Sequence, residues 1–483
     1  METDRKSIGN SSNEKVHESK ESHSAVGHSG LESHDWDPEF EKKTIRQVDW
    51  RMLPLLGVLY AISLIDRTNT GIARTAGMEL DLRLDIGERY SIALCMYFVP
   101  YILFQLPSNL LLRKLGVRNW ITFLVVAWGA AELGMGFVTN WQGLTACRAL
   151  LGLFEAGYFP AMVFVITTWY KRHETQSRLS IFYVSSLFIT AFSPILAFGL
   201  TQMHGLGGQA GWRWIFIIEG IMTIIGGIFA FLFLPDFPDK NKFLTEEQTR
   251  MVLQRIEKDR GDATPDEITK EKVLKHSADW TSWAYGLMFM SSTMPAYAIT
   301  YFITTLLFGM GFNVRDSLLL SAPPFIWSAI WGLAMGFASD RFKSRGFFVL
   351  LNATTVMLGL LITCYAPSNA ARYAGLFIAN GGATGGITGT LAFSANNVCS
   401  HSKRAVSTAI IIAFGGIGGI FGTTVYRQQD FPHYRPGLWA TIACQIMTIL
   451  LTFTLMFVYR QRNKKADETG EVLEGTPGFR YIL

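Results

Sequence analysis

The chain has 483 residues, of which 49% are hydrophobic and only 17% are charged, whereas soluble domains carry about 25% charge. The charges lie between long apolar runs, and a soluble protein of this size would need them on its surface, so the composition excludes a soluble globular fold. The formal net charge of +5 comes from Lys and Arg beside the apolar runs, as on the cytoplasmic face of a membrane protein and unlike a nucleic-acid binder.

The N-terminal segment is polar. Residues 1–49 are rich in Ser, Glu, Lys and His and have no early apolar core, so they do not form a signal peptide. We expect a disordered cytoplasmic tail.

Twelve apolar segments follow, each long enough to cross a bilayer core of about 30 Å, which needs about 20 residues as helix. The first six lie near 51–72, 90–112, 119–139, 143–169, 179–202 and 212–234, and the second six near 281–309, 317–339, 347–366, 372–398, 405–426 and 437–459. A soluble core does not stack helices this numerous, long and apolar. The sequence therefore predicts an all-α membrane protein with twelve transmembrane helices in two six-helix halves.

The two sets of segments suggest internal repetition. Between them lies the longest polar stretch, which begins with helix-stopping prolines at Pro235 and Pro238 and continues with a capping-box pattern at 245–248. The expected domains are an N-terminal tail (1–49), an N-terminal half (50–234), a cytoplasmic central loop (235–280), a C-terminal half (281–459) and a cytoplasmic C-terminal tail (460–483).

Lysine placement predicts the orientation. Alternate loops carry lysines, at Lys114, Lys171, Lys343 and Lys403, while the opposite loops contain none. The positive-inside rule then places both termini and the central loop in the cytosol. We expect a multi-pass protein of the plasma membrane.

Charged residues inside the apolar segments need an explanation, because each costs at least about 2.5–3.5 kcal/mol at bilayer depth. The first span contains Asp66 and Arg67, and the fourth contains Arg148 and Glu155, which are seven residues apart and share one helix face. The four charges sum to zero, and protonating either acid would free a positive arginine to attract an anion. This predicts proton–anion symport, with Asp66 and Glu155 as the proton-coupling residues; a purely structural salt-bridge cluster is the alternative.

Two further acids lie in apolar segments. Glu219 follows an aromatic turn at 212–214, and we expect it to serve helix packing. Glu132 has no evident local partner, so three interpretations remain: a buried protonated acid, a third proton site, or an acid near the outer interface.

A glycine-rich segment ends the eighth span with Gly336, Asp340 and Arg341, and Arg345 follows. Glycine allows close helix approach, and an acid followed by arginines can form a latch that breaks on switching. We interpret these four residues as a gating motif, although ordinary positive-inside flanking would also give such charges.

The pattern Gly336-x-x-x-Asp340-Arg341-x-x-x-Arg345 resembles the cytoplasmic-loop signature of the major facilitator superfamily. Further motifs lie at 64–69 (LIDRTN), 107–109 (PSN), 148–157 (RALLGLFEAG), 212–220 (WRWIFIIEG) and 244–247 (LTEE). With these, residues 45–460 resemble the anion:cation symporter family and its fungal allantoate-permease branch.

This resemblance implies proton-driven uptake of carboxylates such as nicotinate, allantoate, pantothenate and biotin. It implies that Asp66 and Glu155 carry protons, that Arg67 coordinates the anion and that Arg148 senses Glu155. It also implies that Tyr101 lies in the pocket. Departures from the branch pattern in the pocket-lining spans, at Thr304, Phe393, Phe414-Gly415 and Ser193-Pro194, leave the substrate open.

The second half offers further candidates for substrate binding. Tyr297 and Tyr301 lie one helical turn apart, and helix packing is an equally good interpretation for them. Asn396 and Asn397 favour a cavity, because an amide facing lipid is costly.

Two other functions remain open: an exporter of a secondary metabolite, and a transporter-like nutrient receptor, against which the short C-terminal tail argues. No nucleophile–base set or phosphate-binding loop is present, and the five cysteines are odd in number and irregularly spaced. We therefore expect no enzyme activity, no cofactor and no metal site. The expected partners are protons, a small organic anion and the lipid bilayer, but no nucleic acid, and the protein is expected to be a monomer.

Overall fold

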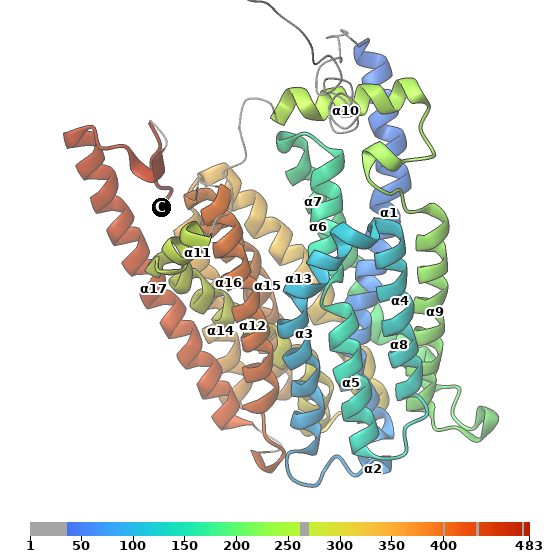
Figure 1. The fold of residues 1–483 in the computed structure, drawn as a ribbon. Coiled ribbons are helices and arrows are strands. Elements are labelled where there is room, and N and C mark those ends of the chain that lie inside the picture. The colour runs from blue at the N-terminus through green and yellow to red at the C-terminus, as the bar shows by residue number, and fades with distance from the viewer. Residues whose placement is uncertain (1–35, 261–269, 399–400, 431–433, 476–477) are drawn as a thin grey trace, which may run out of the picture.

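The computed structural model describes residues 36–260, 270–398, 401–430, 434–475 and 478–483, and its regular elements within these ranges are helices (Figure 1). The first half contains α1 (Pro38–Ala73), α2 (Glu79–Asp81), α3 (Arg89–Leu115), α4 (Val117–Met135), α5 (Trp141–Glu155), α6 (Tyr158–Trp169), α7 (Arg172–Thr190), α8 (Ser193–Thr201) and α9 (Gly211–Phe233). Two short helices follow in the central segment, α10 (Glu246–Arg260) and α11 (Lys270–Ser277). The second half contains α12 (Trp280–Gly309), α13 (Val314–Phe342), α14 (Arg345–Tyr365), α15 (Asn369–Asn397), α16 (His401–Thr424) and α17 (Arg435–Thr469).

The predicted membrane spans correspond to these helices. Within the described ranges, eight helical segments are long and apolar enough to cross a membrane, and α3, α4, α12 and α15 have comparable lengths of 19 to 30 residues. The fourth and fifth predicted spans are each broken into two helices, α5–α6 and α7–α8. Backbone groups in lipid must be satisfied within the segment, which is why long apolar runs become helices. The all-helical membrane fold with two six-helix halves is confirmed.

The two halves lie side by side. Figure 1 shows α1 to α9 on the right and α12 to α17 on the left, with the helices of both running along one common direction. We call the end at which α1 begins and α17 ends the terminal face, and the end near α2 the distal face. The helix α10 lies across the terminal face of the first half.

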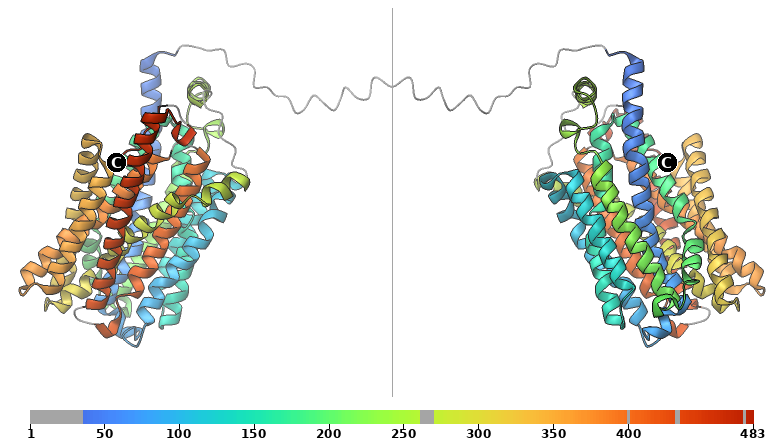
Figure 2. Two further views of the ribbon diagram at one scale, coloured as in Figure 1. Left: turned by 90° about the vertical axis from the view of Figure 1, so that its left-hand side faces the viewer. Right: turned by 90° about the vertical axis from the view of Figure 1, so that its right-hand side faces the viewer.

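Helix α1 is longer than predicted. It begins at Pro38, and the Asp37 side chain caps it by accepting a hydrogen bond from the Glu39 amide. The first turns project beyond the bundle (Figure 2). The predicted disordered tail of residues 1–49 is therefore too long by the helical part from Pro38, and its residues 1–35 lie outside the described ranges.

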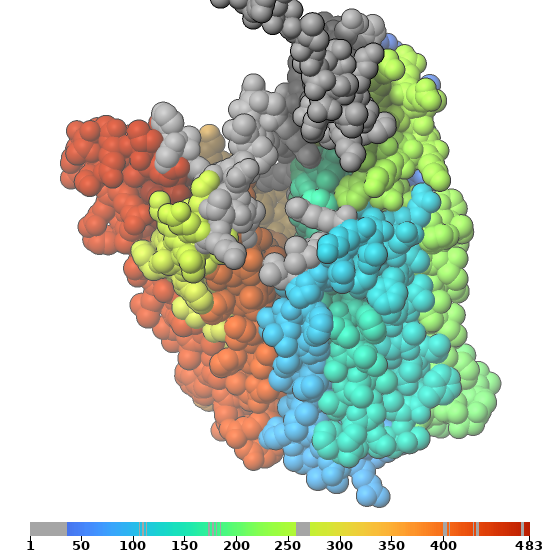
Figure 3. Space-filling view, in the orientation of Figure 1, coloured from blue at the N-terminus to red at the C-terminus, as the bar shows by residue number. Residues whose placement is uncertain are grey.

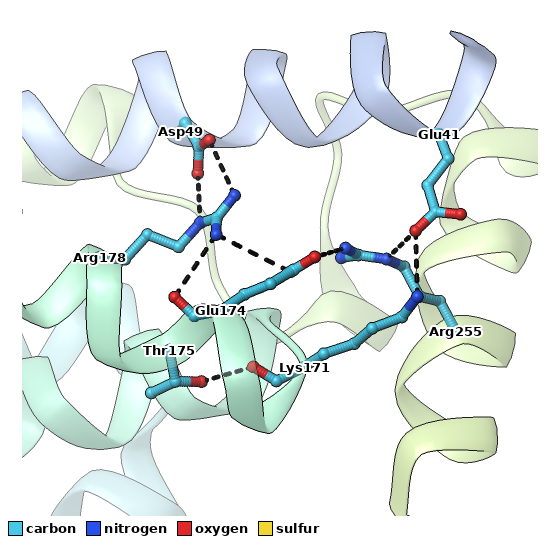
Figure 4. Close-up of polar contacts among 7 residues, drawn as sticks. All are labelled: Glu41, Asp49, Lys171, Glu174, Thr175, Arg178 and Arg255. Atoms are coloured by element: carbon cyan, nitrogen blue, oxygen red, sulfur yellow. Dashed lines mark hydrogen bonds and ion pairs between the residues drawn. The ribbon is translucent and has the colours of Figure 1, made fainter. Parts of the chain in front are cut away.

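A network of ion pairs holds α10 against the first half (Figure 4). Arg255 of α10 contacts Glu41 of α1 at 2.5 Å and also Glu174 of α7. Arg178 of α7 contacts Asp49 of α1 at 3.0 Å. The central segment is thus attached to α1 and α7, and it contains the two helices α10 and α11 where a cytoplasmic loop was expected.

The C-terminal segment folds back onto the second half. The Tyr481 ring stacks on Tyr459 of α17 with a centroid distance of 4.3 Å. Its neighbour Ile482 exchanges two hydrogen bonds with the side chain of Asn397, at 2.8 and 3.0 Å. The predicted C-terminal tail of residues 460–483 is therefore packed over its described part, with α17 continuing to Thr469.

Contacts between the halves concentrate toward the distal face. Tyr90 of α3 donates a hydrogen bond to the backbone oxygen of Tyr301 in α12, and Thr75 donates one to Thr304. Gly71 packs so closely on α12 that a Cβ there would lie 2.7 Å from the Tyr301 oxygen. Toward the terminal face the halves diverge (Figure 1), and the surface is hollowed between them (Figure 3).

Candidate functional site

A cavity of about 440 Å³ lies between the two halves. Helices α1, α3, α6 and α7 line it on one side, and α12, α13, α15 and α16 on the other. It extends toward the terminal-face ends of α15 and α16 at Leu391 and Thr408. Its wall is mainly aromatic and aliphatic with scattered hydroxyl and amide groups, as expected for a site that binds a small organic molecule.

Arg67 of α1 gives this cavity its charge. Of the described residues that line the cavity, it is the only one with a charged side chain. Its guanidinium lies 5.1 Å from the Tyr101 ring centroid and 5.5 Å from that of Tyr97. Aromatic faces favour a cation at such distances. Arg67 and Tyr101 therefore lie together at the cavity wall.

Glu155 of α5 is the ion-pair partner of Arg67. The Arg67 Nε and Nη2 atoms lie 2.6 and 2.5 Å from the same Glu155 oxygen. Ser63 also donates to that oxygen, and the Tyr97 hydroxyl donates to the other at 2.8 Å. The carboxylate is 1% exposed, so the pair lies in a low-dielectric region where a lone charge is expensive.

Arg148 does not contact Glu155 through a hydrogen bond, although both lie on α5. Within the described part of the chain, none of its side-chain nitrogens has a hydrogen-bond partner, and it is fully buried. Its guanidinium lies 5.4 Å from the Tyr97 ring centroid and 5.9 Å from that of Tyr301. In this conformation Arg67, and not Arg148, forms the ion pair with Glu155, and the role of Arg148 as a charge partner stays a prediction.

Asp66 lies apart from the cavity. One of its oxygens accepts hydrogen bonds from Trp128 of α4 at 3.1 Å and from Thr223 of α9 at 3.3 Å. Carboxylate oxygens of Asp66, Glu132 and Glu219 lie within 4.8 Å of one another, and all three residues are buried. The predicted quartet is thus divided, with Asp66 in an acid cluster and Arg67 with Glu155 at the cavity.

The second-half candidates differ in position. Tyr297 lines the cavity, whereas Tyr301 lies behind it, fully buried, with its ring stacked on Tyr297. Asn397 binds the backbone of Ile482, and neither it nor Asn396 is among the cavity-lining residues. The structure does not bring these two asparagines to the cavity, because α15 ends at Asn397, near the terminal face.

The predicted gating motif lies where α13 passes into α14. Asp340 and Arg345 form an ion pair. No atom lies within 4 Å of the position that a Cβ would take at Gly336, so no close helix contact is made at this glycine. The side chain of Arg341 is exposed. The pair joins two helices of the same half, and in this conformation no contact of these residues with the first half is observed among the described interactions.

Several cavity residues were missed by sequence reasoning. Tyr60 and Tyr183 line the first-half wall, and Asn380 and Thr384 line the second-half wall. Tyr60 could have been found, because it lies seven residues, about two helical turns, before Arg67 and so shares its helix face. Tyr97, which does not line the cavity but donates a hydrogen bond to Glu155, could have been found in the same way, because it precedes Tyr101 by four residues. Asn380 gave no comparable signal within the glycine-rich α15.

The only group of described residues with the spacing of cation ligands is Asp66, Glu132 and Glu219. The neighbouring polar groups are donors: Trp128 donates an N–H to Asp66, and Asn69 donates its amide to Glu219. A hard cation needs six or more oxygen ligands or waters. Inward-pointing N–H groups do not supply them, so this donor set fits protons better than a metal ion.

Comparison with known proteins gives a family and a fold. The family model described as Major Facilitator Superfamily matches residues 56–423. An uncharacterized transporter of Schizosaccharomyces pombe is 32% identical over 455 residues, covering 92% of this chain and 91% of that protein. The major facilitator-type transporter hxnP of Emericella nidulans is 31% identical over 472 residues, covering 92% of this chain and 94% of that protein.

Among solved structures, a bacterial homologue of the human lysosomal transporter Spinster superposes with a TM-score of 0.64 at 15% identity, covering 85% of this chain and 97% of that chain. The xylose transporter XylE of E. coli superposes with a TM-score of 0.62 at 12% identity, covering 84% of this chain and 98% of that chain. At these identities, the likeness concerns the fold alone.

Proposed function

Because this chain belongs to the major facilitator superfamily, we propose that it is a secondary active transporter in which protons drive the symport of a small organic anion across the plasma membrane. Within the superfamily we place it in the anion:cation symporter family, in the fungal allantoate-permease branch. Its substrate would be a carboxylate of the vitamin or ureide type. Both termini, and with them the terminal face, would lie in the cytosol.

One observation carries this proposal: the only charged side chain on the cavity wall, in the described part, is an arginine held by a buried glutamate. A cavity with one fixed positive charge, lined otherwise by aromatic and neutral polar groups, favours a monoanion with an apolar or aromatic body. The guanidinium also presents donors in the fork geometry that matches a carboxylate.

Proton coupling follows from the electrostatics of the pair. While Glu155 is ionised, it neutralises Arg67 and competes with an incoming anion. Protonation of Glu155 removes that competitor and leaves a buried, uncompensated Arg67, which costs several kcal/mol unless another anion replaces the glutamate. Proton and anion therefore favour each other's binding, which is the thermodynamic requirement for symport.

The conformation suits one half of a transport cycle. The halves are packed at the distal face, and the cavity extends toward the terminal face. With the terminal face in the cytosol, this is the state from which a bound anion leaves to the cytosol and Glu155 gives up its proton. Breaking the distal contacts around Gly71 and Tyr301 would then expose the same cavity to the other side.

The test is uptake into proteoliposomes that contain the purified chain. Labelled nicotinate, allantoate, pantothenate and biotin are offered under an inward proton gradient. We expect one or more to accumulate above the external concentration, with loss of accumulation on addition of a protonophore. Accumulation that the protonophore does not reduce would overturn the proposal. Accumulation of uncharged solutes only would also overturn it.

A further inference from the structure

Three buried acids meet in the first half, away from the cavity. Asp66 comes from α1, Glu132 from α4 and Glu219 from α9, and they are 0%, 0% and 3% exposed. Oxygens of all three lie within 4.8 Å of one another. Three ionised carboxylates at such distances repel strongly in a low-dielectric environment, so they cannot all be charged at once.

Most of the oxygens in this group have no protein donor. In the described part of the chain, both Glu132 oxygens, one Asp66 oxygen and one Glu219 oxygen lack a hydrogen-bond partner. A buried unpaired carboxylate oxygen costs free energy that a proton on a neighbouring acid can recover. A carboxyl O–H on Glu132 could donate to the unpaired oxygen of Asp66 or to that of Glu219, which would give that oxygen a partner.

The surrounding positive charge is insufficient to keep these acids ionised. The charged groups that act most strongly on Glu132 are Asp66 on α1, Glu219 on α9, and both Arg148 and Glu155 on α5. The charge of Arg67 is already neutralised by its ion pair with Glu155. Four buried acids thus face two buried arginines, an excess of two negative charges. The site therefore approaches neutrality with two protons bound.

We propose that Glu132 is a further proton-carrying residue, which holds an exchangeable proton shared with Asp66 and Glu219. The proposal rests on proton-coupled transport as the function and adds a second place where protons reside, separate from Glu155. In the step that we infer, the O–H bond of Glu132 breaks and an O–H bond forms on Asp66. Glu132 is left as carboxylate, and Asp66 becomes the neutral acid. No other reactant is needed.

A structural role alone does not account for this geometry. A packing acid would be expected to accept a hydrogen bond from a backbone or side-chain donor, as Glu219 does from the side-chain amide of Asn69. Glu132 has no such partner among the described residues, yet its carboxylate is fully enclosed. The donors that point into the group, from Trp128 and Asn69, also disfavour a metal or sodium ion there.

Infrared difference spectroscopy of the full-length protein in lipid nanodiscs, without substrate, tests the proposal. The protein is titrated with acid and base, and the carbonyl stretching band of protonated carboxylic acids is followed. We expect such a band at neutral pH, a shift of the band in heavy water, and its loss or clear reduction in Glu132→Gln. Glu88→Gln, at an acid in the loop before α3, is the matched control and should leave the band unchanged.

The outcomes of this titration separate the alternatives. A wild-type protein without the band at neutral pH would overturn the proposal whether or not the variant folds. So would a band that is identical in Glu132→Gln, or one that sodium removes when it replaces choline at constant pH. Because no anion is used, failure of all tested anions to accumulate would overturn the symport function without changing this spectroscopic result.

Transport provides a second readout once an anion is found to accumulate. Glutamine mimics a glutamate that is always protonated, so Glu132→Gln should flatten the dependence of uptake on external pH and lower the number of protons moved per anion. A change in maximal rate alone, with the pH profile and proton ratio preserved, would indicate a structural role and contradict the proposal.

Discussion

Arg67 donates a hydrogen bond from Nε to one oxygen of Glu155 at 2.6 Å, and its Nη2 forms an ion pair with the same oxygen at 2.5 Å. The glutamate thus occupies the geometry that a substrate carboxylate would take on the guanidinium. Release of Arg67 from Glu155 and binding of the anion to Arg67 are therefore two parts of one exchange of partners on the same guanidinium.

From this exchange we expect Glu155→Gln to abolish concentrative uptake while anion exchange across the membrane persists. Glutamine cannot be ionised, so Arg67 would remain available to the anion without a proton. The ratio of internal to external anion should fall to about one under a proton gradient, measured in proteoliposomes. Accumulation at the wild-type ratio would show that Glu155 carries no transported proton.

Tyr97→Phe is the matched control for this variant. It removes the 2.8 Å hydrogen bond to the second Glu155 oxygen but leaves the ion pair with Arg67 intact. A hydrogen bond to a charged group contributes about 1.5–3 kcal/mol. We expect a loss of stability of that order with concentrative transport retained, because the ion pair between Arg67 and Glu155 is unchanged.

The sequence predicted the spans because apolar length is a local property that survives folding, and all twelve appear within the described helices. The partners of the buried charges are not local. Asp66 and Arg67 are neighbours in the chain, but successive residues of a helix point about 100° apart. Asp66 therefore faces α4 and α9 while Arg67 faces α5. Grouping charges by their place in the sequence could not reveal this division.

The second-half candidates show the same limit in another form. Tyr297 lines the cavity. Asn397 was predicted to face a cavity because a buried amide needs a hydrogen-bond partner, and its partner is the C-terminal backbone at Ile482. The chemical argument for burial was sound. The distance of 85 positions between the two residues placed the partner beyond any local pattern.

Gly71→Val should disfavour the observed conformation. A Cβ at this position would lie 2.7 Å from the backbone oxygen of Tyr301, so α1 and α12 would have to separate near the distal face. We expect a membrane-impermeant maleimide to label a cysteine introduced at Thr304 several-fold faster in this variant. Gly336→Ala is the control, since no atom lies within 4 Å of its Cβ position. Equal labelling in all three proteins would show that Gly71 does not hold the distal contact.

Asn397→Ala should reduce stability without changing anion affinity. The side chain exchanges two hydrogen bonds with Ile482 and donates one to the backbone of Phe393. Loss of buried partners of this kind costs about 1–3 kcal/mol. We expect a lower melting temperature in detergent, and little further loss when residues 479–483 are also deleted, because both changes remove the same contact.

Asn396→Ala is the comparison for this variant. Asn396 is only partly buried and is adjacent to Asn397 on α15. We expect its melting temperature to stay close to that of the wild type. A loss of anion affinity in Asn397→Ala with unchanged melting temperature would instead support a substrate-binding role for Asn397.

An ion pair at the terminal face should make stability depend on acid pH. Asp279, which caps α12, contacts the Lys403 ammonium at 2.7 Å, and Lys403 also contacts Glu474 at 2.8 Å. Burial alone would raise the pKa of Asp279, but the hydrogen bonds from Lys403 and the Thr281 amide outweigh burial and hold the pKa below its ordinary value. The folded state thus favours the ionised acid. Its stabilising contribution is complete above the ordinary aspartate pKa of about 4 and is lost as the pH falls through the lower folded value.

Asp279→Asn removes this titration, so the wild type should melt at a higher temperature than the variant at neutral pH, and the two should converge as the pH falls below about 4. The expected difference at neutral pH corresponds to about 1 kcal/mol, because the pair is partly exposed and screened by solvent. Glu468→Gln, at the strongly exposed pair with Lys464, should match the wild type throughout. A difference between wild type and Asp279→Asn that persists unchanged into acid would mean that Asp279 stabilises α12 as a neutral cap rather than through its charge.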